Sequence, residues 1–299
     1  MDKFVSVIIP VLNNIEELRK TLTALEAQTY PQKMYEVIVV DNGSKQDLSP
    51  VVSQFKQAKL TYEPQPGSYI ARNQGISIAG GEILAFTDSD CIPEPEWLVQ
   101  GVAQLRSVKN CGLVAGKINF SYQDPQQPTI VELYDSSTFL NQKRYIEQHH
   151  YGATANLFTT KSVFKNVGNF NSGLKSGGDK EWGQRVYQHG YRLVYSADTC
   201  IAHPARASLS EIARKITRTR AGGYDLESLT TSNKLKLNWQ RLTTLLWRLK
   251  PPSKSVFTKL NSCMDSVSLS QKIQLIGIAI GLHYYGVWGD LKSYLKINS

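Results

Sequence analysis

The chain has 299 residues, of which 41% are hydrophobic and 20% are charged. This composition indicates an ordinary globular protein, built either as one large domain or as one domain with an appended region. Its four cysteines show neither CxxC pairs nor zinc-finger spacing, which favours reduced thiols over a disulfide framework: Cys91, Cys111, Cys200 and Cys263. Residues 1–4 lead directly into a strand pattern without an export signal, so we expect a cytoplasmic protein.

The net charge of +9 is concentrated in one segment. Residues 206–260 contain twelve Lys and Arg against three Asp and Glu, whereas the rest of the chain has 22 of each kind. This distribution argues against a nucleic-acid-binding N-terminal domain, and we expect no nucleic-acid partner. The basic segment instead predicts an anionic partner, either a phosphate group or an anionic membrane surface.

The first ninety residues alternate between strand and helix patterns. Apolar, β-rich runs typical of strands lie at residues 4–10, 37–40, 60–62 and 83–86. Patterns of helical period lie at residues 16–28, 48–55 and 69–79. Such alternation predicts a parallel α/β sheet with right-handed connections.

Two carboxylates, Asp88 and Asp90, follow the fourth strand directly and are separated by Ser89. A loop at the carboxyl end of a buried strand can turn both toward one hard divalent cation that also holds phosphate oxygens. The alternative is a solvated turn in which an Asp caps the next helix.

Polar residues also follow the first two strands. Residues 10–14 read Pro-Val-Leu-Asn-Asn, which lacks the GxGxxG of a nicotinamide-binding Rossmann domain and argues against that class. Asp41, at the end of the second strand, can accept hydrogen bonds from a base or a ribose. Arg72 could reach a diphosphate, or form a surface ion pair instead.

Four motifs in this order resemble glycosyltransferase family 2. They lie at residues 5–10 with Asn13 or Asn14, at 39–44, at 71–75 and at 86–90. The similarity continues through residues 152–158, 167–170, 177–179 and 190–193, and it covers about residues 4 to 206. The resemblance implies an α/β domain of the GT-A fold, a Rossmann-like architecture that binds nucleotide-diphosphate sugars.

The resemblance also implies where the donor and its metal bind. The residues implied for the nucleotide sugar are Pro10, Val11, Asn13, Asp41, Arg72, Asp88 and Ser89. A Mg²⁺ or Mn²⁺ ion is implied on Asp90 and Asp88, where it bridges the diphosphate. His203 matches a family position that can complete the metal shell, and the alternative is a loop histidine without a ligand.

A second acidic cluster lies at residues 176–182, where the acidic residues are Asp179 and Glu181. Family members often carry Glu-Asp here, so Asp179 matches the catalytic base and Gly178 replaces the Glu. Inversion in one displacement needs a base, because the acceptor hydroxyl must lose its proton as it attacks. Asp179 could alternatively cap a helix, with Glu181 as the fallback base. Trp182 either stacks on the acceptor sugar or packs in the core.

The resemblance fades after about residue 206, which predicts a catalytic domain of residues 1–205 and a basic, mainly helical region of residues 206–299. A helix rich in basic residues is expected to end near residues 221–223, and either to close over the diphosphate or to lie on anionic lipid. Its basic residues are Arg206, Arg214, Lys215, Arg218 and Arg220. The apolar stretch at residues 273–288 is shorter than the about 20 residues of a bilayer span, so an interfacial or packing helix is expected.

The sequence therefore predicts a metal-dependent, inverting glycosyltransferase. Its expected acceptor is a glycan or a lipid-linked hydroxyl in polysaccharide, glycolipid or cell-envelope glycan synthesis, with the enzyme peripheral on the cytoplasmic face of the membrane. A nucleotidyltransferase is one alternative, but it should show a Gly-rich basic loop after the first strand. A non-catalytic glycan-binding or scaffold protein is another, although it would tolerate the loss of Asp90 or Asp179, and both are present.

Overall fold

The computed structural model describes residues 3–230, 234–252, 260 and 267–297. The chain divides into two compact units. Unit 1 consists of Met1–Phe120 and Leu140–Pro204, and unit 2 consists of Ser121–Phe139 and Ala205–Ser299. Residues 121–139 thus group with the C-terminal region, whereas the sequence analysis placed them in the catalytic domain of residues 1–205.

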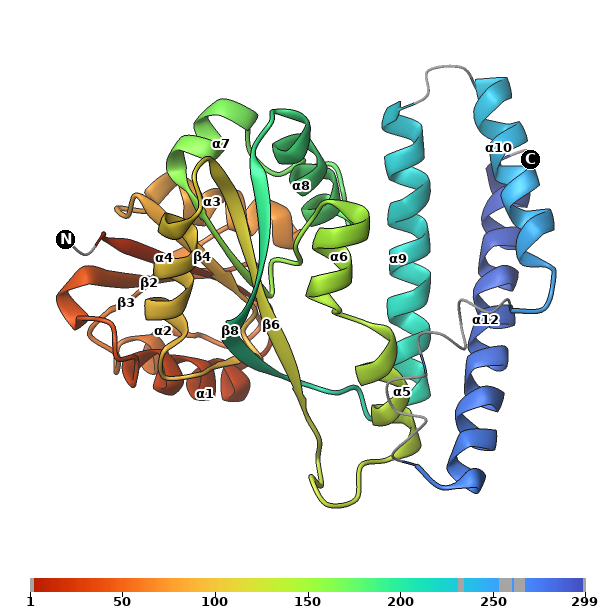
Figure 1. Ribbon diagram of the computed structural model, residues 1–299, viewed down its shortest axis with the longest axis horizontal. Helices are drawn as coiled ribbons and strands as arrows, with labels where there is room; N and C mark the ends of the chain where they lie inside the picture. The colour runs from red at the N-terminus through yellow and green to blue at the C-terminus, as the bar shows by residue number, and fades with distance from the viewer. Residues whose placement is uncertain (1–2, 231–233, 253–259, 261–266, 298–299) are drawn as a thin grey trace. The chain divides into compact units, whose positions relative to one another are not determined.

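Unit 1 is built on an eight-stranded sheet in the order β3-β2-β1-β4-β7-β6-β8-β5 (Figure 1). Its strands are β1 (Val5–Val11), β2 (Tyr35–Asp41), β3 (Ala58–Tyr62), β4 (Ile83–Thr87), β5 (Ile92–Pro93), β6 (Cys111–Ser121), β7 (Asn156–Thr160) and β8 (Arg192–Pro204). The first four strands pair in parallel, as predicted. The later strands pair antiparallel, β7 with β4 and β6, and β8 with β5, so the sheet is mixed.

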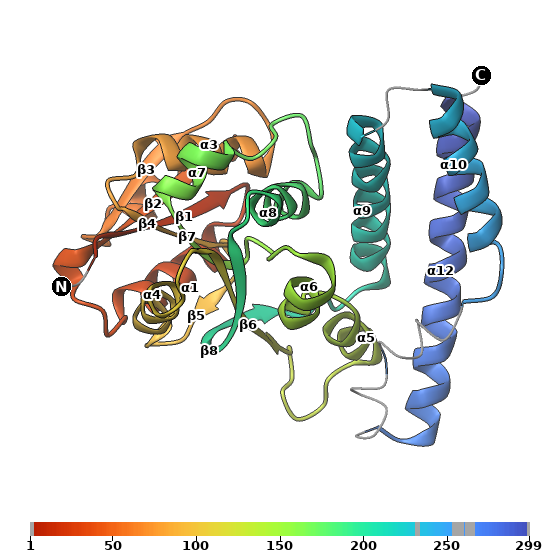
Figure 2. The same cartoon turned by 45° about the horizontal axis from the view of Figure 1, so that its top comes forward.

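Helices cover both faces of this sheet, with α3 and α7 on one face and α1 and α4 on the other (Figures 1 and 2). The helices of unit 1 are α1 (Ile15–Glu26), α2 (Ser49–Val52), α3 (Ser68–Ile78), α4 (Trp97–Ser107), α6 (Gln142–His149), α7 (Lys161–Val167) and α8 (Gly178–Gln188). Burial on both faces explains why β1 and β4 are continuous apolar runs rather than alternating ones. Gly75 lets α3 approach closely, because a Cβ there would lie 2.5 Å from Ile8.

The helix predicted at residues 48–55 is shorter than expected. The N–H groups of Gln54 and Phe55 bond to carbonyls three residues back rather than four, so the chain tightens into a turn after Val52.

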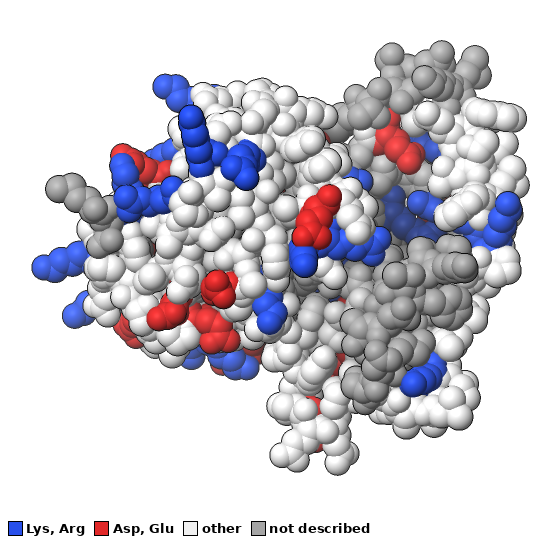
Figure 3. All heavy atoms as spheres, viewed as in Figure 1, with Lys and Arg blue, Asp and Glu red and all other residues white. Residues whose placement is uncertain are grey.

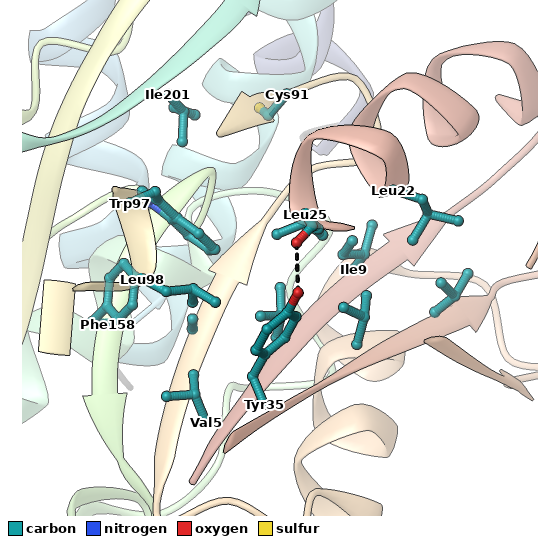
Figure 4. Packing of buried hydrophobic residues seen from close by; sticks show 14 of the residues in the cluster. Val5, Ile9, Leu22, Leu25, Tyr35, Cys91, Trp97, Leu98, Phe158 and Ile201 are labelled. Atoms are coloured by element: carbon teal, nitrogen blue, oxygen red, sulfur yellow. Dashed lines mark hydrogen bonds between the residues drawn. The ribbon is translucent and has the colours of Figure 1, made fainter. Parts of the chain in front are cut away.

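The main core of unit 1 lies between the sheet and the helices α1 and α4 (Figure 4). Trp97, at the start of α4, is fully buried against Phe158, with ring centroids 4.7 Å apart, so its side chain packs in the core. The Tyr35 hydroxyl donates a 2.8 Å hydrogen bond to the Leu25 carbonyl, as the dashed line in Figure 4 shows. This hydrogen bond gives the buried Tyr35 hydroxyl a partner inside the core.

Unit 2 is helical, as predicted for the C-terminal region. Its helices include α5 (Ile130–Thr138), α9 (Leu209–Thr230), α10 (Lys234–Arg248) and α12 (Leu269–Ile297). Helix α12 packs against the other three. The core that α12 shares with α5 and α9 includes Leu133, Tyr134, Ile212, Leu275, Ala279 and Leu282.

The prediction that the basic helix ends near residues 221–223 is wrong, because α9 continues to Thr230. Buried Arg241 of α10 donates to the Tyr224 carbonyl and the Ser228 hydroxyl, which holds the second half of α9 in place. Arg206 precedes the helix and pairs with buried Asp135.

Charged side chains of both signs are interspersed on the face of unit 1 that Figure 3 shows, in agreement with the balanced charge outside residues 206–260. Within the described ranges, no helix combines the length and the apolar character needed to cross a bilayer. The described cysteines are all free, as predicted, and Cys263 lies outside the described residues.

Candidate active site

The loops after β1 and β2 lie at one edge of the sheet, because Val11 pairs with Asp41 in parallel register. Asn13 adopts a left-handed conformation (φ 54°), which Asn tolerates better than most residues. Its backbone N–H donates to Ser44 Oγ at 3.0 Å, and its side-chain oxygen accepts the N–H of Lys45 at 2.8 Å. Ser44 N–H in turn donates to Asp41 Oδ1 at 2.8 Å. These bonds fix Asn13 and Asp41 beside each other.

The loop after β4 joins the same edge through Asn14. Its amide donates to Ser89 Oγ at 3.2 Å, and the carbonyl of Ser89 accepts the Thr21 hydroxyl at 3.0 Å. Ser89 is only 8% exposed. Asn14 therefore supports the loop that carries the two Asp residues.

Four potential ligand atoms, from Asp88, Asp90, Cys91 and His203, lie within 4.8 Å of one another. His203 reaches the two carboxylates because β8 runs antiparallel to β5, with Ala202 opposite Ile92. The structure thus brings together all three residues that the sequence suggested for a metal.

The geometry of His203 fits a metal ligand. Its Nδ1 lies 2.8 Å from the Pro204 carbonyl oxygen, which can only accept, so Nδ1 carries the hydrogen. In the neutral ring the Nε2 lone pair is then free to bind a cation, the arrangement that metal-bound histidines commonly show.

Cys91 is less suited to a hard cation. It is fully buried in the apolar core, and burial together with the charges of Asp88 and Asp90 raises the pKa of its thiol well above the ordinary value. The two carboxylates are the hard oxygen donors that suit Mg²⁺ or Mn²⁺, and the imidazole adds a nitrogen donor of the kind that transition metals accept.

Arg72 lies on α3 next to this cluster. It is 4% exposed, and its Nη2 donates to Asp88 Oδ1 at 2.5 Å, so a buried guanidinium pairs with a partly exposed carboxylate instead of forming the surface pair considered as an alternative. Within the described part of the chain, its Nε has no hydrogen-bond partner. A buried donor without a partner is costly, which points to a ligand that would accept from it.

Asp179 is the second residue of α8, and the N-cap residue is Gly177, with φ 80°. Asp179 Oδ1 accepts the Tyr69 hydroxyl at 3.2 Å and the Lys180 N–H at 3.0 Å. Burial raises the pKa of the Asp179 carboxyl, and the Arg72 charge partly offsets this effect. The Asp179 carboxylate is therefore a stronger base than the carboxylate of an exposed Asp, although it interacts with the charge of Arg72.

Glu181 forms an ion pair with Arg185. Both of its carboxylate oxygens accept from Arg185, at 2.5 and 3.1 Å, and Arg185 also donates to the carbonyls of Val167 and Asn169. This ion pair favours Asp179 over Glu181 as the base.

The suggestion that Trp182 stacks on an acceptor is wrong. Its side chain is fully buried and stacks on Phe164 with ring centroids 4.5 Å apart, while its Nε1 donates to the Gly168 carbonyl. Trp182 lies on the inward face of α8 and belongs to the core.

The sequence did not reveal the structural roles of Tyr69 and Asn14. The Tyr69 hydroxyl donates a hydrogen bond to Asp179, and the Asn14 amide donates one to Ser89 in the loop after β4. A signal for Tyr69 was present, because it precedes Arg72 by three residues on a predicted helix and so lies on the same face.

Comparisons with known proteins identify the family of the chain. Residues 6–168 match the family model described as "Glycosyl transferase family 2". The chain is 40% identical over 260 residues to glycosyltransferase AglE of Haloferax volcanii, covering 83% of both chains. It is 30% identical to the pre-mycofactocin glycosyltransferase of Mycobacterium tuberculosis over 71% of this chain and 45% of that protein.

The fold is also similar to a solved structure, that of the mannosyltransferase PcManGT from Pyrobaculum calidifontis in complex with GDP-Man and Mn²⁺. The TM-score is 0.61 at 20% identity, over 99% of this chain and 85% of that one. This likeness confirms the GT-A fold. On the extent of the family match and the identity to AglE, the chain belongs to glycosyltransferase family 2.

Proposed function

We propose that this glycosyltransferase moves a sugar from a nucleotide-diphosphate sugar to a hydroxyl acceptor, with inversion at the anomeric carbon. The observation that carries the proposal is that buried Arg72 interacts both with Asp179 and with Asp88, which belongs to the cluster of Asp88, Asp90 and His203. A base and a cation site beside each other are what a single displacement of a diphosphate requires.

The donor nucleotide binds at the strand ends in this proposal. Asn13 and Asp41 are fixed beside each other there, and one Asp41 oxygen accepts from Ser44. The other oxygen can accept hydrogen bonds from the base or the ribose. Pro10, Val11 and Ser89 complete this edge.

A divalent cation, Mg²⁺ or Mn²⁺, would be held by Asp90, Asp88 and His203, and when bound it neutralises charge on the departing diphosphate. The Mn²⁺ and GDP-Man named for the solved relative support this choice. Arg72 keeps Asp88 oriented through Nη2, and its Nε offers a hydrogen bond to a diphosphate oxygen.

Asp179 acts as the general base. The acceptor oxygen attacks the anomeric carbon as its proton passes to the Asp179 carboxylate, and the bond from that carbon to the diphosphate oxygen breaks with its electron pair on the diphosphate. The raised pKa of Asp179 favours this proton transfer, because a stronger base accepts the proton more readily.

The acceptor is proposed to be a glycan or a lipid-linked hydroxyl, as in polysaccharide, glycolipid or cell-envelope glycan synthesis, with the enzyme on an anionic membrane surface. Exposed apolar residues of α12 recur every four or seven residues on one helix face: Leu269, Ile273, Ile280, Tyr284, Trp288 and Leu295. Lys292 lies over the Trp288 ring at 5.2 Å, which places a cation beside this face. An apolar stripe with adjacent basic residues suits a lipid interface.

A screen of nucleotide sugars for slow hydrolysis in the presence of Mn²⁺ tests the function without knowledge of the acceptor. We expect one class of nucleotide sugar to release its nucleoside diphosphate, and the release to require the metal. Release of pyrophosphate from nucleoside triphosphates instead would identify a nucleotidyltransferase. No turnover of any donor, together with no metal-dependent nucleotide binding, would support the scaffold alternative.

A further inference from the structure

Gly178 comes directly before Asp179, and the structure leaves no room for a side chain at this position. A Cβ at Gly178 would lie 2.7 to 2.9 Å from three atoms of the Tyr69 ring, closer than side-chain carbons approach one another. The ring of Tyr69 therefore occupies the room that any side chain at position 178 would need.

The Tyr69 ring is held on several sides. It is 7% exposed, lies 5.8 Å from the Phe170 ring, and has the Arg72 guanidinium 5.8 Å from its centroid. A ring fixed in this way directs its hydroxyl to one place. That place is Asp179 Oδ1, at 3.2 Å.

The hydroxyl of Tyr69 remains a donor. Burial, and next the negative charge of Asp179, raise the pKa of Tyr69 well above its ordinary value, so the hydroxyl keeps its proton. The Lys180 N–H donates to the same oxygen, Oδ1, at 3.0 Å. With these two donors on Oδ1, the geometry leaves Oδ2 to face the acceptor hydroxyl.

Resting on the proposed function, in which Asp179 is the base, we propose that Tyr69 is its positioning residue. The tyrosine orients the Asp179 carboxylate through the hydrogen bond that its hydroxyl donates. Tyr69 itself transfers no proton and makes no contact with the reacting atoms. Its effect is on the rate of the chemical step and not on donor affinity.

Tyr69→Phe removes the hydroxyl and keeps the ring against Gly178. With the nucleotide sugar and Mn²⁺ that the hydrolysis screen identifies, we expect kcat to fall about 10-fold or more, the usual effect of a lost hydrogen bond to a charged group. KM for the donor and the melting temperature should stay close to those of the parent. Gly178→Ala should lower kcat to a similar degree, because its Cβ displaces the ring.

Tyr35→Phe is the matched control. It also removes a buried tyrosine hydroxyl that donates a hydrogen bond, here to the Leu25 carbonyl at 2.8 Å in the core. We expect Tyr35→Phe to change the melting temperature and to leave kcat unchanged, so a general loss of stability is separated from lost positioning.

A second measurement needs neither donor nor acceptor. The carboxyl carbon of Asp179 is followed by ¹³C NMR in protein labelled at Asp, and Asp179→Asn assigns its signal. The charged or titratable groups that face this carboxyl are Tyr69 and Arg72 of α3, Asp88 after β4, and Tyr145 and Tyr151. Because Tyr69 stabilises the charged carboxylate, Tyr69→Phe should raise the pKa of Asp179 further.

The outcomes separate this inference from the proposed function. If Asp179→Asn loses turnover while Tyr69→Phe retains the kcat of the parent and the Asp179 signal titrates unchanged, Tyr69 is not a positioning residue and the proposed base stands. If Asp179→Asn retains full turnover, the base itself is misassigned and both ideas fail. A lower kcat with unchanged donor KM, together with a shifted Asp179 titration, supports the inference.

Discussion

Asp90 and His203 are far apart in the sequence, yet their ligand atoms lie within 4.8 Å of each other and of Asp88. We expect Asp90→Ala to abolish metal-dependent binding of a nucleoside diphosphate, because the diphosphate charge then lacks its counter-ion. Isothermal titration calorimetry with Mn²⁺ measures this directly. Asp47→Ala, which removes an exposed carboxylate that caps the Ser49 N–H, should bind like the parent. Equal affinities in Asp90→Ala and the parent would exclude Asp90 as a ligand.

Asp179 gives the second prediction at this scale. Asp179→Asn keeps the size of the side chain but cannot accept a proton, so turnover should fall by roughly 10² to 10⁴ at nearly constant donor affinity. In the parent, the rate should decline as the pH falls through the raised pKa of Asp179, because only the ionised carboxyl accepts the proton. This decline should begin at a higher pH than an ordinary Asp would give, and Asp179→Asn should lack it.

Glu181→Gln is the control for that assay. Its parent carboxylate is held by Arg185, so the substitution should affect stability more than turnover. Loss of turnover in Glu181→Gln, with activity retained in Asp179→Asn, would show that the base is Glu181 and not Asp179.

At the scale of elements, α12 is anchored by a buried carboxylate. Asp290 is 1% exposed and pairs with Arg220 of α9 and with Arg248 of α10, the latter at 2.8 Å. Burial and the neighbouring Asp290 raise the pKa of Tyr224 to about 12, which keeps that hydroxyl protonated beside the pair. The cluster ties three helices of unit 2 together and fixes Arg220, which the sequence had suggested for anion binding.

Asp290→Ala leaves two partly buried guanidinium groups without their partner. We expect it to lower the free energy of unfolding by about 3 to 5 kcal/mol, the usual cost of removing one side of a buried ion pair. Chemical denaturation followed by circular dichroism measures this loss. Asp225→Ala, at an exposed position of α9, should change the stability by less than about 0.5 kcal/mol. Similar values for the two variants would show that the cluster contributes little.

At the scale of the whole molecule, the surplus of basic residues and the exposed apolar face of α12 lie in the same unit. If both contact lipid, the protein should cosediment with anionic vesicles and not with neutral ones. Salt should weaken this binding, because each Lys or Arg near the surface contributes about 1 kcal/mol that ions screen.

Two substitutions make the vesicle test specific. Trp288→Glu, in the exposed face of α12, should reduce cosedimentation, whereas Tyr187→Glu, at an exposed aromatic residue of unit 1, should not. Equal binding to neutral and anionic vesicles, or binding to neither, would reject the lipid surface as a partner.

The sequence by itself determined the local features of this protein. The parallel strands β1 to β4, the helices between them and the carboxylates after β4 follow from apolar period and turn residues, which act over a few neighbours. The family motifs carried the assignment of the class for the same reason, since each is a short contiguous segment.

Only the tertiary structure decided the features that depend on distant pairings. The antiparallel half of the sheet places His203 beside Asp90, the packing of α8 buries Trp182 and engages Glu181 with Arg185, and residues 121–139 join the C-terminal helices. Tyr69 meets Asp179 and Gly178 across more than a hundred residues. Local periodicity reports which face of an element is apolar, but the partner that covers that face is chosen by the packing of the whole chain, because many pairings bury similar apolar area.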